Sequence, residues 1–126
     1  MLRILYVGND PNDLAWERLQ SANGFEYEKV GQVYDAMDKI NRGNHDGLFL
    51  ASLRVPPITN YNNLTRGGFD IIEEARKKGL PIIVRTGFRD DKVHKKLSEL
   101  GVTVLRAPNH LELVVPTVKK VFGEAA

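Results

Sequence analysis

The sequence contains no cysteine, and this absence removes several kinds of site at once. Disulfides, thiol catalysis and thiolate metal ligands are all excluded. The three histidines, His45, His94 and His110, are far apart in the sequence, and none stands with carboxylates at a spacing typical of metal sites. We therefore expect no metal, no cofactor and no catalytic histidine.

Long apolar runs are also missing. No stretch approaches the roughly 18 apolar residues that a membrane span needs. The apolar start of the chain, residues 1–8, is too short for the apolar region of a secretory signal and has no small-residue cleavage site. Together with the lack of cysteine, this predicts a cytoplasmic protein without a membrane partner.

A large excess of charge of one sign is also absent. The 18 basic and 16 acidic residues leave a net charge of +2, an excess too small to indicate nucleic-acid binding. The basic clusters 76–78 and 92–96 also fit the solvated faces of helices. The sequence has no P-loop, dinucleotide fingerprint or nucleophile elbow, so we do not expect an enzyme.

What the sequence does contain is a regular alternation of strand-length apolar runs and segments with helical spacing. The apolar runs are 2–7, 25–30, 48–51, 81–84 and 102–105, and the helical segments are 12–23, 32–41, 69–78, 90–100 and 111–122. Parallel strands need right-handed crossovers, so the helices must cover both faces of one sheet. We expect a single α/β domain over residues 1–126: a (βα)5 doubly wound, flavodoxin-like, open five-stranded sheet in a three-layer sandwich.

Several local signals refine this arrangement. Residues 25–30 alternate apolar and charged side chains, as an edge strand does. Asp10 and Asp13 are both candidates to cap the first helix, and Gly24 is expected to end it. Pro116 should kink the last helix or delay its regular start, because proline has no N–H to donate.

In such a sheet, ligands bind beside the carboxyl ends of the strands, where the strand order reverses. The residues that this topology brings there are Gly8, Asn9, Asp10, Ser52, Leu53, Arg54, Thr86, Gly87, Arg106, Ala107 and Pro108. A flavin phosphate is not expected among them, because Asp10 would repel it.

Over its whole length the chain resembles the receiver domain of response regulators. The resemblance rests on five motifs in the expected order: Asp10-Pro11, Leu53–Pro56, Gly68–Ile72, Pro81–Gly87 and Ala107-Pro108. It implies signal transduction in a two-component system. It also implies a site in which acidic residues after the first strand hold Mg²⁺, an aspartate after the third strand accepts a phosphoryl group, and a lysine after the fifth strand neutralises it.

The positions that would carry this chemistry depart from the family pattern. Gly8 and Asn9 stand where the acidic pair is expected, which leaves Asp10 as a single carboxylate and a poor Mg²⁺ site. The phosphoacceptor position falls on Ser52, or on Ala51 in the alternative register, and neither is a carboxylate. Phosphoryl transfer needs its developing negative charge offset, so we expect a degenerate pseudo-receiver site.

The last two positions leave more room for interpretation. Ala107 takes the place of the lysine when Pro108 sets the register, and the adjacent Arg106 is expected to point to the opposite face. A slip of one residue would reverse that assignment. Thr86 matches the switch hydroxyl of receivers, but a hydroxyl that caps the fourth helix or bonds a loop amide explains it equally well.

By elimination, the expected function is a phosphorylation-independent signalling role through protein–protein interaction. In receivers the fourth helix, fifth strand and fifth helix carry output, and the matching residues form a possible interaction face: Lys92, Lys95, Lys96, Val104, Lys119 and Lys120. The irregular loop 53–68 is a second candidate. With no output domain in the sequence, the partner would be another protein, such as a sensor kinase or an output protein, and a homodimer is also open.

Two alternatives stay open. The strand-tip crevice could bind a small ligand or a nucleotide, or Asp10 or Ser52 could serve an atypical phospho-switch.

Overall fold

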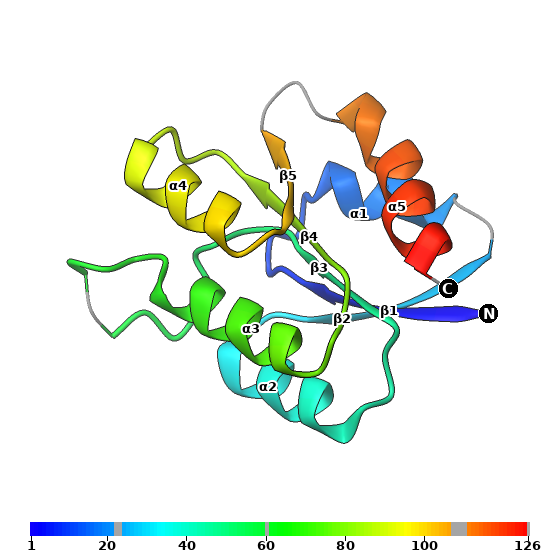
Figure 1. Cartoon of the computed structure of the whole chain (residues 1–126), viewed down its shortest axis with the longest axis horizontal. Coiled ribbons are helices and arrows are strands. Elements are labelled where there is room, and N and C mark those ends of the chain that lie inside the picture. The colour runs from blue at the N-terminus through cyan, green and yellow to red at the C-terminus, as the bar shows by residue number, and fades with distance from the viewer. Residues whose placement is uncertain (22–23, 60, 107–110, 126) are drawn as a thin grey trace.

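The computed structural model describes residues 1–21, 24–59, 61–106 and 111–125, and in these ranges a five-stranded parallel sheet lies between two layers of helices (Figure 1). The strands are β1 (Leu2–Val7), β2 (Phe25–Val30), β3 (Gly47–Leu50), β4 (Ile82–Thr86) and β5 (Thr103–Arg106). The helices are α1 (Leu14–Gln20), α2 (Val33–Arg42), α3 (Arg66–Lys77), α4 (Asp91–Glu99) and α5 (Leu111–Ala125). The strand order is β2-β1-β3-β4-β5, which confirms the predicted doubly wound fold and the edge position of β2.

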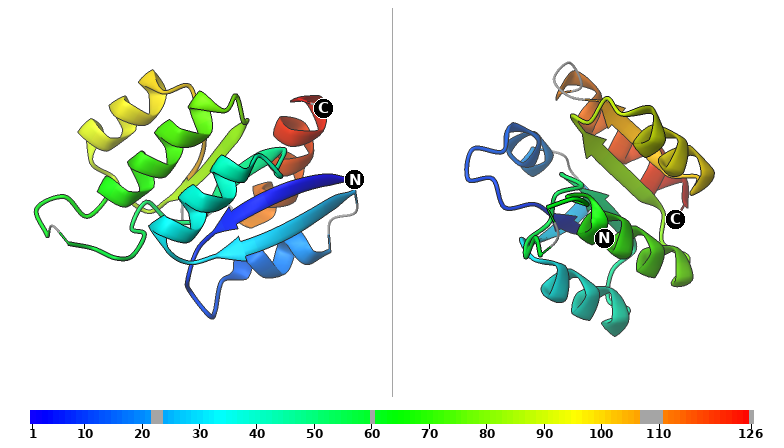
Figure 2. Two further views of the ribbon diagram at one scale, coloured as in Figure 1. Left: turned by 90° about the horizontal axis from the view of Figure 1, so that it is seen from below. Right: turned by 90° about the vertical axis from the view of Figure 1, so that its left-hand side faces the viewer.

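The central strands send alternate side chains into the two helical layers. Leu48, Leu50 and Val84 belong to the core beneath α2, α3 and α4. Phe49 and Ile83 belong to the core beneath α1 and α5, and all five side chains are fully buried. Figure 2 shows helices on both faces of the sheet. The sheet is therefore a rigid platform that fixes the positions of the strand ends. None of the helices in the described ranges combines the length and the apolar character needed to cross a membrane.

The first helix is shorter than its apolar spacing predicts. The Asp13 side chain accepts hydrogen bonds from the amides of Ala15 and Trp16, so the helix begins at Leu14 rather than at residue 12. Ser21 is the C-cap, and the prediction that Gly24 ends this helix is wrong. The choice between Asp10 and Asp13 as the cap is settled in favour of Asp13 by its hydrogen bonds.

The start of α3 differs most from its prediction among the other helices. α3 begins at Arg66, three residues before Phe69, because its first turn lies directly against the preceding loop. A Cβ atom on Gly68 would stand 2.5 Å from the Leu53 carbonyl oxygen, so only glycine fits there without a shift. Pro116 lies inside α5, which begins at Leu111 as predicted, so of the two effects expected of this proline, a kink or a delayed start, the delayed start is wrong.

A buried histidine lies at the end of the sheet opposite the carboxyl ends of the strands. His45 precedes β3, its side chain is 2% exposed, and its Nε2 lies 2.9 Å from Oε1 of Glu28. The Lys39 ammonium also pairs with Glu28 at 2.9 Å. Burial lowers the pKa of His45, although the hydrogen bond to Glu28 opposes this effect.

This histidine should make the protein less stable in mild acid. The folded state binds the proton less readily than the unfolded chain, so the free energy of unfolding should fall as the pH drops below about 6.5. A His45→Gln variant keeps a side-chain amide near Glu28 but does not titrate, and urea unfolding at about pH 7.5 and 5.5 should show a smaller loss than in the wild type. A pH dependence as steep as that of the wild type would contradict this assignment, since the other two histidines are shared by both proteins.

Candidate functional site

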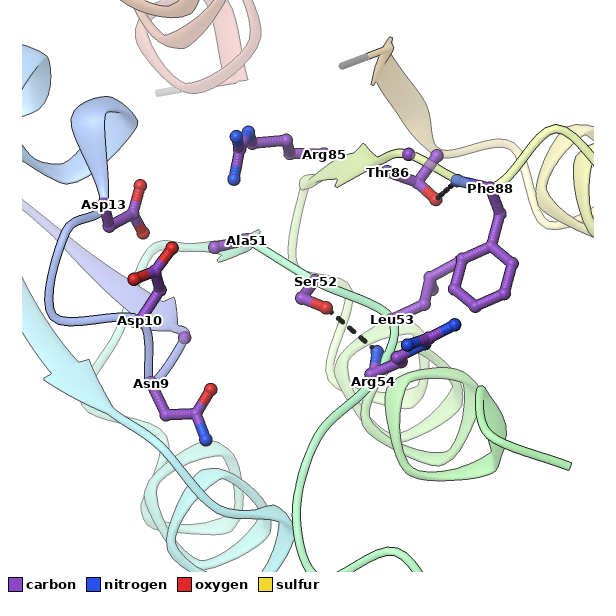
Figure 3. Close-up of a pocket in the computed structure, with 12 residues that line it drawn as sticks. Asn9, Asp10, Asp13, Ala51, Ser52, Leu53, Arg54, Arg85, Thr86 and Phe88 are labelled. Atoms are coloured by element: carbon purple, nitrogen blue, oxygen red, sulfur yellow. Dashed lines mark hydrogen bonds between the residues drawn. The ribbon is translucent and has the colours of Figure 1, made fainter. Parts of the chain in front are cut away.

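The loops that follow β1, β3 and β4 enclose a crevice of about 430 Å³ at the carboxyl ends of the strands (Figure 3). It lies where the strand order reverses around β1, the place where doubly wound sheets bind ligands. The residues that line it are Gly8, Asn9, Asp10, Asp13, Ala51, Ser52, Leu53, Arg54, Arg85, Thr86, Gly87 and Phe88. The structure thus brings together the predicted positions after three strands.

Gly8 and Ala51 stand side by side at the tips of β1 and β3. The Ala51 amide bonds the Val7 carbonyl at 2.8 Å, which continues the pairing of the two strands beyond their ends. A Cβ atom on Gly8 would lie 2.9 Å from the Ala51 Cβ and 3.3 Å from the Tyr6 ring. A carboxylate side chain at position 8 therefore has no room unless the strand tips move.

Asp13 is a buried carboxylate with its oxygens already bonded. One oxygen accepts from the amides of Ala15 and Trp16 at the start of α1. The other accepts a short hydrogen bond from the Tyr6 hydroxyl. Burial, followed by the bond to Asp13, raises the pKa of Tyr6, so the phenol stays protonated and keeps donating. Asp13 is thus a structural acceptor that ties α1 to the core.

Asp10 lies on the open side of the crevice. It is exposed, and one of its oxygens accepts a hydrogen bond of 2.9 Å from the Asn12 amide in the turn before α1. Asn9 is exposed as well. In the described ranges, no group of three or more histidine, cysteine, aspartate or glutamate side chains is placed to hold a metal ion.

Two hydroxyl side chains line the crevice, Ser52 after β3 and Thr86 at the end of β4. The Ser52 hydroxyl accepts from the Arg54 amide at 3.1 Å, and the Thr86 hydroxyl accepts from the Phe88 amide at 3.0 Å. Thr86 is 3% exposed. Its hydroxyl therefore bonds a loop amide, which is one of the two structural explanations that the sequence left open.

Two arginines line the crevice: Arg54, which the topology predicted there, and Arg85, which it did not. Arg85 lines it, and Figure 3 shows its guanidinium turned to the side from which Asp13 projects. The signal was a charged residue in the apolar strand β4. The Arg54 guanidinium lies 5.1 Å from the centre of the Phe88 ring, a contact that joins the loops after β3 and β4.

The fifth strand contributes less than its motif suggests. Arg106 pairs with Thr86 in the register of β4 and β5, but it is exposed and does not line the crevice. Ala107, the other candidate for the lysine position, lies outside the described residues, as does His110. Of the remaining histidines, His94 places its Nε2 2.6 Å from the Phe88 carbonyl oxygen, next to the start of α4.

The residues of the possible interaction face do not all point the same way. Lys92 and Lys96 line a groove between α3 and α4, and the Lys96 ammonium lies 4.2 Å from the centre of the Phe69 ring. Lys95 is exposed on α4 outside this groove. Val104 packs against the core on β5, and Lys119 and Lys120 are exposed on α5. The predicted face is therefore divided into two surfaces. The groove beside α3 contains Lys92 and Lys96, and the surface around β5 contains Lys95, Val104, Lys119 and Lys120.

The Gly8–Ala51 contact makes a direct prediction about the family's acidic pair. Gly8→Asp should lower the free energy of unfolding by about 1–3 kcal/mol through overpacking, whereas Asn9→Asp, at an exposed neighbouring position, should change it by less than about 0.5 kcal/mol. Urea unfolding of the two variants measures both values. Equal stability of the two variants would show that a carboxylate at position 8 is accommodated.

No protein-family model matches this sequence, and no curated protein matches it. Several solved structures, however, match the fold of this chain. The non-phosphorylated HemR receiver domain from Leptospira biflexa is 24% identical, with a TM-score of 0.77, over 97% of this chain and 94% of that one. The receiver domain of the Francisella response regulator 1452 is 15% identical, with a TM-score of 0.76, over 100% of both chains.

The signal receiver domain of a LuxO repressor protein from Vibrio parahaemolyticus gives the same picture. It is 16% identical, with a TM-score of 0.77, over 98% of this chain and 92% of that chain. These likenesses cover the whole arrangement of strands and helices. The chain thus has the fold of the response-regulator receiver domains.

Proposed function

We propose that this chain is a receiver-like signalling module that acts without phosphorylation, by binding another protein, and that it is not an enzyme. The observation that carries the proposal is the contact between Gly8 and Ala51, where a Cβ atom on Gly8 would lie 2.9 Å from the Ala51 Cβ. The close packing of Gly8 against Ala51 leaves no room at position 8 for the side chain of an acidic Mg²⁺ ligand. Without a bound cation, the charge that develops on a transferred phosphoryl group would not be offset.

The groups that remain at the strand tips support the same proposal. Asp13 is occupied by the Tyr6 hydroxyl and two amides. Ser52 and Thr86 each bond the amide two residues further on. These hydrogen bonds hold the loops in place without a phosphoryl group. The loops therefore do not need phosphorylation to take up this conformation.

The fold supports the signalling half of the proposal. The similar structures carry names of receiver domains, which are signalling modules. For this chain the surface around β5 is the proposed contact. It combines the edge strand of the sheet with exposed charges of both signs on α4 and α5, lysines among them, and a partner with the complementary pattern of charges would fit it.

A capture experiment with three charge-reversed double variants tests this surface. Lys95→Glu with Lys120→Glu changes the β5 surface, Lys92→Glu with Lys96→Glu changes the groove beside α3, and Lys77→Glu with Lys78→Glu is the control of equal charge change. Each immobilised protein is incubated with lysate of the source cells, with and without Mg²⁺ and a small phosphodonor. We expect one protein to be retained equally with and without the donor, and to be lost only from the β5-surface variant.

Two outcomes would count against the proposal. Retention that requires the phosphodonor would contradict phosphorylation independence. Retention that survives in the β5-surface variant but is lost from the groove variant would move the contact to the side of α3.

A further inference from the structure

The strand-tip crevice contains charges of opposite sign, and those of Asp10, Asp13 and Arg54 are not joined by an ion pair. Asp10 and Asp13 project from the loop after β1, and Arg54 lies in the loop after β3 (Figure 3). The ion pairs found among the described residues lie elsewhere and include none of these three side chains. Asp10 and Arg54 are both exposed, so a ligand with two opposite charges can reach and pair with both of them.

One end of the crevice is rich in hydrogen-bond donors. The oxygens of Ser52 and Thr86 accept from the amides of Arg54 and Phe88, which leaves both hydroxyl hydrogens available to donate. The Arg54 guanidinium, 5.1 Å from the centre of the Phe88 ring, belongs to a residue that lines the same crevice. Two hydroxyls and a guanidinium are suited to a carboxylate, and hydrogen bonds between charged groups are the strong ones.

The other end offers an acceptor. Both oxygens of Asp13 are bonded to the protein, to the amides of Ala15 and Trp16 and to Tyr6. Asp10 is exposed and accepts one amide at 2.9 Å, and a carboxylate has room for further donors. Asp10 is therefore the group to which a ligand ammonium would bind.

We propose that this crevice is a binding site for a small zwitterion of the amino-acid type, with its ammonium at Asp10 and its carboxylate at Ser52, Thr86 and Arg54. The volume of about 430 Å³ lies within the ordinary range for small-molecule sites. Simple anions fit less well, because Asp10 repels them. The site does not depend on a partner protein, so this proposal and the proposed function can fail separately.

A titration followed by ¹H–¹⁵N NMR tests the site. The probes are glycine, β-alanine and γ-aminobutyrate, zwitterions of increasing length, with butyrate, butylamine and inorganic phosphate as probes of single charge sign at equal ionic strength. The amides of Asn12, Arg54 and Phe88 are the reporters, because they bond Asp10, Ser52 and Thr86.

We expect saturable shifts of these amides with at least one zwitterion, and binding of the single-charge probes at least about tenfold weaker. Equal or tighter binding of butyrate or phosphate would show a plain anion site and overturn the proposal. No saturable shift with any of the zwitterions would also overturn it.

A variant at Asp10 tests the acidic end of the site. Asp10→Asn keeps an oxygen for the Asn12 amide but removes the charge, so zwitterion affinity should fall about tenfold while butyrate binding does not weaken. Glu26→Gln, an equal loss of charge on the exposed edge strand β2, is the control and should leave both affinities unchanged. Unchanged zwitterion affinity in Asp10→Asn, with a well-dispersed spectrum, would remove Asp10 from the site and overturn the proposal.

Discussion

The close approach of β1 and β3 at their carboxyl ends is the constraint on which the site depends. The Ala51 amide still bonds the Val7 carbonyl one residue past β3, so Gly8 and Ala51 remain as close as paired strand residues. The Tyr6 ring lies against the same position, so that it also limits the space around Gly8. A side chain at position 8 would require the strand tips to move, and the carboxylates of this loop are those of Asp10 and Asp13.

Contacts within the chain also fix the other groups around the crevice. Asp13 starts α1 and binds the Tyr6 hydroxyl, so its carboxylate is part of the packing between the sheet and that helix. The Thr86 hydroxyl at the tip of β4 accepts a hydrogen bond from the Phe88 amide of its own loop. Arg54 on the Phe88 ring links the loops after β3 and β4. These interactions within the chain connect the loops that surround the crevice.

The sequence was sufficient for the order of elements and for the place of the site, because both follow from apolar periodicity and parallel topology. It could not locate contacts between residues far apart in the chain. The bond of His45 to Glu28 joins residues on different elements, and Arg85 enters the crevice from a strand that reads as apolar. Helix starts failed where a side-chain cap or a close backbone approach, as at Asp13 and Gly68, outweighed spacing.

The most direct test of the central claim is the intact mass of the protein after incubation with Mg²⁺ and a small phosphodonor, alongside a receiver domain that has its acceptor aspartate. We predict that the control gains a phosphoryl group and that this chain does not, because Gly8, Ala51 and Ser52 offer neither the acidic Mg²⁺ ligand nor the acceptor carboxylate. A stoichiometric gain of one phosphoryl group, located on Asp10 or on any other carboxylate of the chain, would contradict the account.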